Sequence, residues 1–234
     1  MTVDHDSRSG PRHAVVTGAS SGIGRAIGER LLGGGWRVTG IDRAPPALTH
    51  PDFKGLQADL AEPGALSARL AEIGAVSALV HAAGYMRVGR LGELEPDNGE
   101  GMWRVHVGAA ETLANAFAPH MGEGGRIVLI GSRTANGAAG RSQYAATKAA
   151  LTGLARSWAI ELAPRQITVN VIAPAATDTP FLHDPNRAGT APVLPPMGRF
   201  VDPAEVAALT AFLLSPEAAA ITGQTITICA GASL

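Results

Sequence analysis

Short apolar runs alternate along the whole chain with stretches in which apolar residues recur at helical spacing. The apolar runs lie near residues 14–17, 36–41, 55–58, 77–81, 126–131, 167–172 and 225–228. Such alternation predicts parallel strands joined by helical crossovers. We therefore expect a single-domain α/β fold of the doubly wound Rossmann type, with a mostly parallel seven-stranded sheet and helices on both faces. A ligand of such a sheet lies outside the carboxyl ends of the strands, where the strand order reverses.

The first apolar run leads into a glycine-rich turn, Thr17–Gly24, which opens the next helical pattern. Gly18 allows the turn, Gly22 lets the backbone approach a diphosphate, and Gly24 permits close packing of helix on strand. The spacing is G-x-x-x-G-x-G and not the better-known G-x-G-x-x-G, and an isolated glycine cluster is as often a plain turn. Its place between strand and helix favours a loop that binds a phosphate-bearing ligand.

Asp42 closes the second apolar run, where a dinucleotide fold places an acid against the adenosine ribose. A carboxylate there repels a 2′-phosphate, so the residue favours NAD over NADP. Arg43 would instead attract that phosphate, but the glycine loop offers Ser21 and no basic residue. The alternative is that Asp42 only begins a turn.

Tyr144 and Lys148 stand four residues apart in a predicted helix that begins near Gln143, so both side chains fall on one face. A tyrosine hydroxyl titrates near pH ~10, and a neighbouring ammonium favours the phenolate and lowers that pKa. The pair is therefore a candidate general acid/base. Taken alone, a Tyr-x-x-x-Lys pair is more often a surface tyrosine beside a solvated lysine.

Together, these motifs resemble the short-chain dehydrogenase/reductase family from about His13 to the C-terminus. The order of the glycine motif, Ala58-Asp59-Leu60, His81-Ala82-Ala83-Gly84, Ser132, Tyr144-x-x-x-Lys148 and Asn170–Thr179 matches that family. The resemblance implies hydride transfer between a secondary alcohol or ketone and NAD, with Ser132, Tyr144, Lys148 and His106 as catalytic residues. It implies cofactor contacts from Gly18, Ser20, Ser21, Gly22, Ile23, Gly24, Asp42, Arg43, Asp59, Leu60, Ala82, Ala83, Gly84, Tyr144, Lys148, Pro174, Thr177 and Thr179.

The chain also departs from the family pattern. His106 stands for the asparagine that kinks a helix and helps to hold a water of the proton relay, and its imidazole either joins that relay or merely replaces the asparagine sterically. His81, Ala175 and Cys229 replace other residues of the pattern and look structural. These departures leave open a second reading, a catalytically silent dinucleotide-binding sensor or subunit.

Three segments are expected to wall the substrate pocket: residues 85–87, 133–142 and a proline-rich lid at 181–200. Residues 82–89 and 177–180 are locally similar to family members that oxidise ring-hydroxylated compounds, such as 2,3-dihydro-2,3-dihydroxybenzoate dehydrogenase. Arg87 or Arg141 would pair with a substrate carboxylate, unless both are simply solvated.

Composition narrows the remaining choices. The 234 residues are 46% hydrophobic and 4% aromatic, enough for one sizeable core. A net charge of −1 and the lack of basic runs argue against a nucleic-acid or membrane partner. The single Cys229 excludes an intramolecular disulfide, and no residue cluster has metal-ligand spacing.

Residues 1–12 are polar and read as a flexible tail before a catalytic domain at 13–234. No signal peptide or apolar span of ~20 residues is visible, which favours a cytoplasmic protein. The predicted helices at 144–162 and 101–121 carry few charges on any face. We expect them to pack against symmetry mates in a homotetramer, with a dimer as the alternative.

Overall fold

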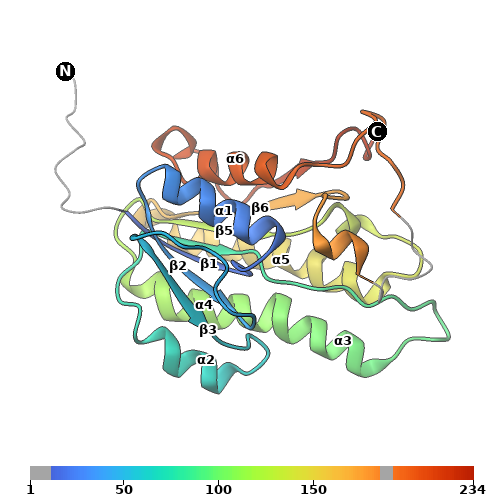
Figure 1. Cartoon of the computed structure of the whole chain (residues 1–234), viewed down its shortest axis with the longest axis horizontal. Coiled ribbons are helices and arrows are strands. Elements are labelled where there is room, and N and C mark those ends of the chain that lie inside the picture. The colour runs from blue at the N-terminus through green and yellow to red at the C-terminus, as the bar shows by residue number, and fades with distance from the viewer. Residues whose placement is uncertain (1–11, 185–191) are drawn as a thin grey trace.

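A computed structural model describes residues 12–184 and 192–234 and contains one parallel sheet of seven strands. The strand order is β3-β2-β1-β4-β5-β6-β7, so the first three strands extend the sheet to one side and the later strands extend it to the other, and the order reverses between β1 and β4. This arrangement confirms the predicted doubly wound fold (Figure 1). The strands are β1 (His13–Thr17), β2 (Arg37–Asp42), β3 (Phe53–Gln57), β4 (Ala78–His81), β5 (Arg126–Ile130), β6 (Thr168–Pro174) and β7 (Thr225–Ile228).

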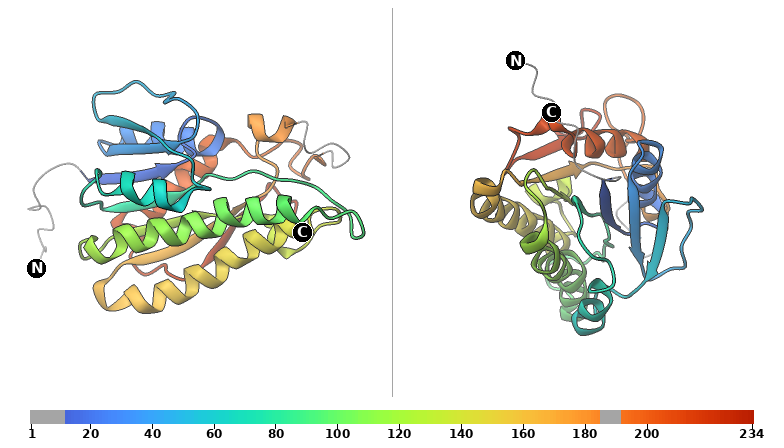
Figure 2. Two further views of the ribbon diagram at one scale, coloured as in Figure 1. Left: turned by 90° about the horizontal axis from the view of Figure 1, so that it is seen from below. Right: turned by 90° about the vertical axis from the view of Figure 1, so that its left-hand side faces the viewer.

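Helices cover both faces of the sheet. The α-helices are α1 (Gly22–Gly33), α2 (Pro63–Leu70), α3 (Pro96–Trp103), α4 (Ala109–Phe117), α5 (Ser142–Leu162) and α6 (Pro203–Leu213). Helices α1 and α6 pack together on one face, while α4 and α5 run side by side across the other, with α2 beside α4 (Figure 2).

The strands alternate their side chains between two cores, because successive residues of a strand point to opposite faces. Val15 and Leu79 pack under α4 and α5, whereas Val16 and Val80 pack under α1 and α6. All four side chains are fully buried. The central strands are therefore apolar on both faces, as the continuous apolar runs in the sequence predict.

The helix predicted at residues 101–121 differs from the observed element. It begins earlier, at Pro96, and ends as an α-helix at Phe117. Between α3 and α4, residues Arg104–Gly108 form a π-helical turn, in which the Ala109 N–H donates to the Arg104 carbonyl. A π-turn inserts one residue into the helical repeat and commonly marks a functional site. Here it places His106 at the bend.

The ends of the chain and the lid are described only in part. The predicted tail lies outside the described residues except for Arg12, whose guanidinium stands 4.3 Å from the centroid of the Trp36 ring. Lid residues 185–191 also lie outside them. No helix within the two described ranges is long and apolar enough to cross a membrane.

Candidate functional site

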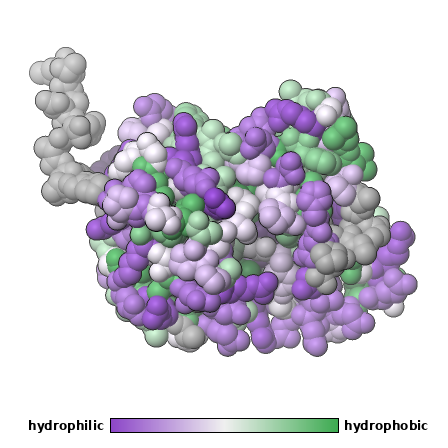
Figure 3. All heavy atoms as spheres, in the orientation of Figure 1, coloured by the Kyte–Doolittle hydropathy of each residue, from purple (hydrophilic) through white to green (hydrophobic). Residues whose placement is uncertain are grey.

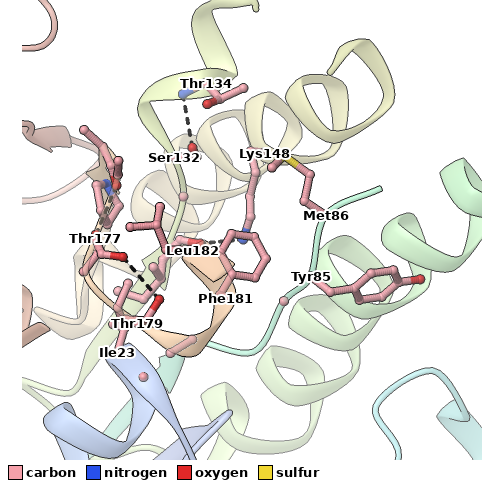
Figure 4. A pocket seen from close by; sticks show the side chains of 18 of the residues that line it. Ile23, Tyr85, Met86, Ser132, Thr134, Lys148, Thr177, Thr179, Phe181 and Leu182 are labelled. Atoms are coloured by element: carbon pink, nitrogen blue, oxygen red, sulfur yellow. Dashed lines mark hydrogen bonds between the residues drawn. The ribbon is translucent and has the colours of Figure 1, made fainter. Parts of the chain in front are cut away.

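A cavity of about 760 Å³ opens at the carboxyl ends of the strands. Most of the residues predicted from the sequence line it, including Ser132, Tyr144 and Lys148 (Figure 4). The lining cofactor residues are Gly18, Ser21, Gly22, Ile23, Gly24, Asp42, Arg43, Asp59, Leu60, Ala82, Ala83, Gly84, Pro174, Thr177 and Thr179. Ser20 and His106 do not line the cavity. The structure therefore brings the other predicted site residues together around one cavity.

The glycine loop is shaped by close backbone contacts. Gly18 has φ +69°, and a Cβ there would lie 3.0 Å from the backbone of Ala83. A Cβ on Gly24 would lie 2.2 Å from the Gly18 carbonyl oxygen, so α1 can pack on the turn only through glycine. Ser21 caps α1 without a side-chain hydrogen bond to its amides. The N-terminus of α1 thus faces the cavity with backbone N–H groups available for an anion.

Asp42 braces the glycine loop and also shapes the turn that follows β2. One carboxylate oxygen accepts a hydrogen bond from the Ser20 N–H at 3.0 Å, and the other accepts from the Ala44 N–H at 2.9 Å. Ser20 therefore acts through its backbone, and its hydroxyl lies toward the Ala44 carbonyl at 3.5 Å. Asp42 therefore forms the turn, and it also lines the cavity.

The segment after β6 closes the opposite wall. The Thr177 hydroxyl donates to the Ala175 carbonyl at 3.0 Å, and the buried Thr179 hydroxyl lies 3.3 Å from the Thr177 carbonyl. Thr179 also faces Gly22, where an added Cβ would lie 3.3 Å from the threonine side chain. The glycine loop and this segment therefore approach each other across the cavity.

Lys148 is 4% exposed and projects from α5, as Figure 4 shows. Its Nζ donates to the Ile130 carbonyl at 2.8 Å and lies 6.0 Å from the centroid of the Tyr144 ring. Burial lowers the pKa of Lys148 to about 7, because the interior disfavours the ammonium. Within the described residues, Lys148 forms no ion pair with a carboxylate.

Ser132 ends the loop after β5 and caps the short 3₁₀ turn Arg133–Asn136. Its Oγ accepts a hydrogen bond from the Thr134 N–H at 3.1 Å, the dashed contact in Figure 4. The backbone donor uses an oxygen lone pair and leaves the hydroxyl proton for another acceptor. Ser132 is therefore arranged to donate into the cavity that it lines.

His106 lies behind the wall, fully buried, with its ring edge-on to Tyr144 at a centroid distance of 5.6 Å. The Tyr85 N–H donates to Nε2 at 3.1 Å. Nδ1 lies 2.8 Å from the Thr147 hydroxyl, which itself donates to the Tyr144 carbonyl. Nδ1 must then carry the proton. Burial, with the nearby Lys148 charge, lowers the pKa of His106 well below 6.5, so the ring is neutral.

His81 performs a matching task on the other side of the π-turn. Its Nε2 donates to the Val105 carbonyl at 3.0 Å, and its Nδ1 accepts from the Thr17 hydroxyl at 2.9 Å. The Thr17 oxygen accepts in turn from the amides of Ala82 and Ala83. Burial lowers the pKa of His81 to about 3. The sequence motifs gave no sign that the two histidines would jointly fix the π-turn.

The substrate side of the cavity follows the prediction only in part, since of residues 133–142 only Arg133, Thr134 and Arg141 line it. Tyr85 and Met86 line it, but Arg87 does not: its guanidinium donates to the Met86 carbonyl at 3.3 Å and lies 5.0 Å from the centroid of the Tyr85 ring. Phe181 and Leu182 of the lid form part of the wall (Figure 4).

One further part of this wall was missed from the sequence. Gly231, Ala232 and Leu234 line the cavity, whereas Arg133, which also lines it, belongs to a segment that was predicted to do so. Exposed apolar side chains, among them Val193 and Leu194, surround this end of the molecule, where Figure 3 shows hydrophobic atoms gathered. Loop residues carry no periodicity that would have indicated their direction.

The cavity fits a nicotinamide dinucleotide. The amides at the start of α1 suit its diphosphate, and the Asp42 carboxylate lies where it could accept hydrogen bonds from the ribose hydroxyls. The missing Cβ atoms of Gly18 and Gly24 keep the loop close enough to the strands for this approach. Tyr144, Lys148 and Ser132 then lie beyond the nucleotide end, where a nicotinamide ring would meet a substrate.

Comparison with known proteins supports the same conclusion. The sequence profile described as Enoyl-(Acyl carrier protein) reductase matches residues 18–233. The 3-oxoacyl-[acyl-carrier-protein] reductase FabG of Salmonella typhimurium is 37% identical over 234 residues, which cover 93% of this chain and 96% of that protein.

Two solved structures are similar over nearly their whole length. A short chain dehydrogenase from Burkholderia cenocepacia in complex with NADP has a TM-score of 0.84 and 34% identity, over 95% of this chain and 98% of that one. The 3-ketoacyl-(acyl-carrier-protein) reductase from Brucella melitensis complexed with NADH has a TM-score of 0.84 and 28% identity, with the same coverage. A nicotinamide cofactor is common to both, whereas the 2′-phosphate is not.

Proposed function

The chain belongs to the short-chain dehydrogenase/reductase family, and on that premise we propose that it interconverts a secondary alcohol and a ketone with NAD(H). The observation that carries the proposal is that Ser132, Tyr144 and Lys148 line the same cavity as the glycine loop. The names of the similar proteins support reduction of a 3-oxoacyl group as one form of this reaction.

The cofactor supplies the hydride acceptor or donor, and the chain supplies orientation and proton transfer. Ser132 donates its hydroxyl proton in a hydrogen bond to the substrate oxygen and stabilises the charge that develops there. Tyr144 accepts the hydroxyl proton during oxidation and donates it during reduction. Its ring is held by the neighbouring His106 ring, so the phenol keeps one position.

Lys148 has two tasks in this proposal: it holds the nicotinamide ribose and favours the phenolate of Tyr144. Burial holds the pKa of Lys148 near 7, so a bound anionic diphosphate would shift the lysine toward its ammonium form. The charge that tunes Tyr144 thus becomes strongest when the cofactor is present.

Asp42 supports NAD over NADP. Its carboxylate is fixed by the Ser20 and Ala44 amides and lines the cavity, so a 2′-phosphate at the same ribose would meet a fixed negative charge. Arg43 lines the cavity as well, and its positive charge would instead favour the 2′-phosphate of NADP.

We further propose that His106 positions Tyr144 without carrying a proton. Both of its ring nitrogens are engaged, with the Tyr85 amide and the Thr147 hydroxyl. A proton relay through this ring would have to break one of those bonds at each turnover. The expected homotetramer and cytoplasmic location remain predictions.

A turnover assay with a panel of ketones and secondary alcohols, with NAD and NADP in parallel, tests the proposal. Tyr144→Phe should abolish turnover and leave NADH affinity within a few fold, because it removes the transferable proton and keeps the ring. Binding of NADH without turnover by the parent protein on any substrate would favour the silent sensor. Residual activity of Tyr144→Phe above about a tenth of the parent, a loss of under 1.4 kcal/mol in barrier terms, would remove Tyr144 as the acid/base.

A further inference from the structure

Two arginines line the cavity beside the catalytic residues. Arg133 directly follows Ser132, and Arg141 caps the start of α5, the helix that carries Tyr144. Both arginines therefore line the same cavity as Ser132 and Tyr144.

Arg133 has no partner that explains its position. Its Nε is buried and makes no hydrogen bond, and it forms no ion pair with an acid among the described residues. A guanidinium is always charged, and a buried N–H donor without an acceptor is unfavourable. A ligand acceptor in the cavity would remove that cost.

Arg141 is held in place by its backbone. It forms a β-bridge with Gly89, whose N–H donates to the Gly140 carbonyl at 3.0 Å. The bridge joins the loop after β4 to the start of α5, so both walls of the substrate pocket fix the position of this arginine.

The acidic side chains that line the cavity lie at one end of it, where Arg43 also lines the wall. The acids that line it among the described residues, Asp42 and Asp59, lie at the adenosine end. Near Ser132 the basic lining side chains are Arg133, Arg141 and the buried Lys148. Among the described residues no acidic side chain lines this end, and such a surplus of basic groups attracts an anionic ligand.

From this arrangement we propose that the carbonyl substrate carries a carboxylate, bound by Arg133 and Arg141. The inference rests on the proposed reaction and names its substrate class. Planar guanidinium groups match the two oxygens of a carboxylate, and the apolar wall of Met86, Phe181 and Leu182 covers the carbon skeleton between carboxylate and ketone. Arg87 takes no part, since it is engaged with Tyr85 and Met86 outside the cavity wall.

Matched pairs of substrates separate charge from shape. We would measure kcat/KM for 3-oxobutanoate, 4-oxopentanoate and 4-acetylbenzoate, each beside its methyl ester. The parent should prefer at least one acid over its ester by about tenfold or more. Arg133→Gln should lower kcat/KM for that acid by about 10- to 100-fold and leave the ester nearly unchanged, as expected for loss of a charge-assisted hydrogen bond.

Two variants serve as controls. Arg133→Lys keeps the charge and should recover part of the loss, which a purely structural role would not predict. Arg30→Gln removes an exposed arginine from the end of α1, away from the cavity, and should leave the acid-to-ester ratio unchanged.

The outcomes distinguish this inference from the reaction on which it rests. Equal turnover of acids and esters by the parent, or equal losses on both in Arg133→Gln, would overturn the carboxylate site while leaving the dehydrogenase function intact. No turnover of any pair would refute the proposed function. Calorimetric titration of 4-acetylbenzoate into the cofactor complexes of parent and Arg133→Gln then decides the anion site, and equal affinities would overturn it.

Discussion

Replacing the buried lysine of the active site should stabilise the protein while destroying its activity. Lys148 is buried, and among the described residues it donates only to the Ile130 carbonyl and has no carboxylate partner. A buried base whose pKa is lowered costs folding free energy, because the unfolded chain binds a proton that the folded chain holds less tightly. Lys148→Met keeps a chain of similar length and removes that cost.

The magnitude follows from the pKa values. Burial lowers the pKa of Lys148 from 10.5 to about 7, and one pKa unit is about 1.4 kcal/mol, so the full cost is about 5 kcal/mol at or below pH ~7. Between pH ~7 and 10.5 the unfolded chain binds more protons than the folded chain, so the free energy of unfolding of the parent rises with pH through this window. Loss of the hydrogen bond to Ile130 offsets about 1–2 kcal/mol of the gain.

Urea unfolding at fixed protein concentration would measure the effect. Lys148→Met should exceed the parent in free energy of unfolding by about 3 kcal/mol near pH 6.5, and by about 0 near pH 9.5, where most of the cost has disappeared. Lys54, the other lysine of the chain, is exposed on β3, and Lys54→Met should change stability by less than about 0.5 kcal/mol at both pH values. A Lys148→Met variant less stable than the parent near pH 6.5, or a difference independent of pH, would refute the reasoning.

Three other predictions follow from the site and the helices. Asp42→Asn keeps an acceptor for the Ser20 amide but removes the charge, so parallel titrations should show the NAD preference narrowing by about tenfold; a parent that already binds NADPH more tightly would contradict the role of Asp42. His106→Asn should leave the acidic limb of the pH–rate profile in place, because the pKa of His106 lies so far below 6.5 that the ring stays neutral while the enzyme is active. A shift of that limb in the variant would show that the imidazole carries protons. Light scattering should show a tetramer whose contacts include the exposed Trp103 and Ile160, and a monomer at micromolar concentration would exclude that interface.

The strands and the glycine loop could be predicted because their signals are local. An apolar run such as Ile127–Ile130, in a strand that lies between Gly125 and Gly131, leaves few alternatives to a buried strand. Carboxyl ends of neighbouring parallel strands meet at one edge, so Gly18, Asp42 and Ser132 could be placed together without knowledge of their side-chain directions. The structure brings all three to one cavity.

The π-turn and the direction of loop side chains depend on distant residues. The family resemblance implies a kink near His106, but the residue pattern of Gly101–Met121 does not show that the helical repeat changes at Arg104, because the turn is held by His81 and Thr147 from β4 and α5. Arg87 and Arg133 look alike in sequence, yet one lies against Tyr85 and the other lines the cavity. Tertiary packing, which no short pattern encodes, decides between such positions.

The paired tautomers of His81 and His106 make the centre of this site sensitive to acid. Burial is the main cause of the low pKa of both rings, about 3 for His81 and well below 6.5 for His106. Below pH 6.5 these side chains therefore bind protons in the unfolded chain but not in the folded chain. Each ring therefore leaves the free energy of unfolding unchanged above pH 6.5. Between that pH and the pKa of the ring in the folded chain, each ring lowers the free energy of unfolding by about 1.4 kcal/mol per pH unit of acidification. Protonating His81 would put a hydrogen where the Thr17 hydroxyl now donates, and protonating His106 would put one where the Tyr85 amide now donates, so each ring would lose one hydrogen bond. Acidification below about pH 6.5 should therefore lower the stability of the fold through two residues that lie at its catalytic centre.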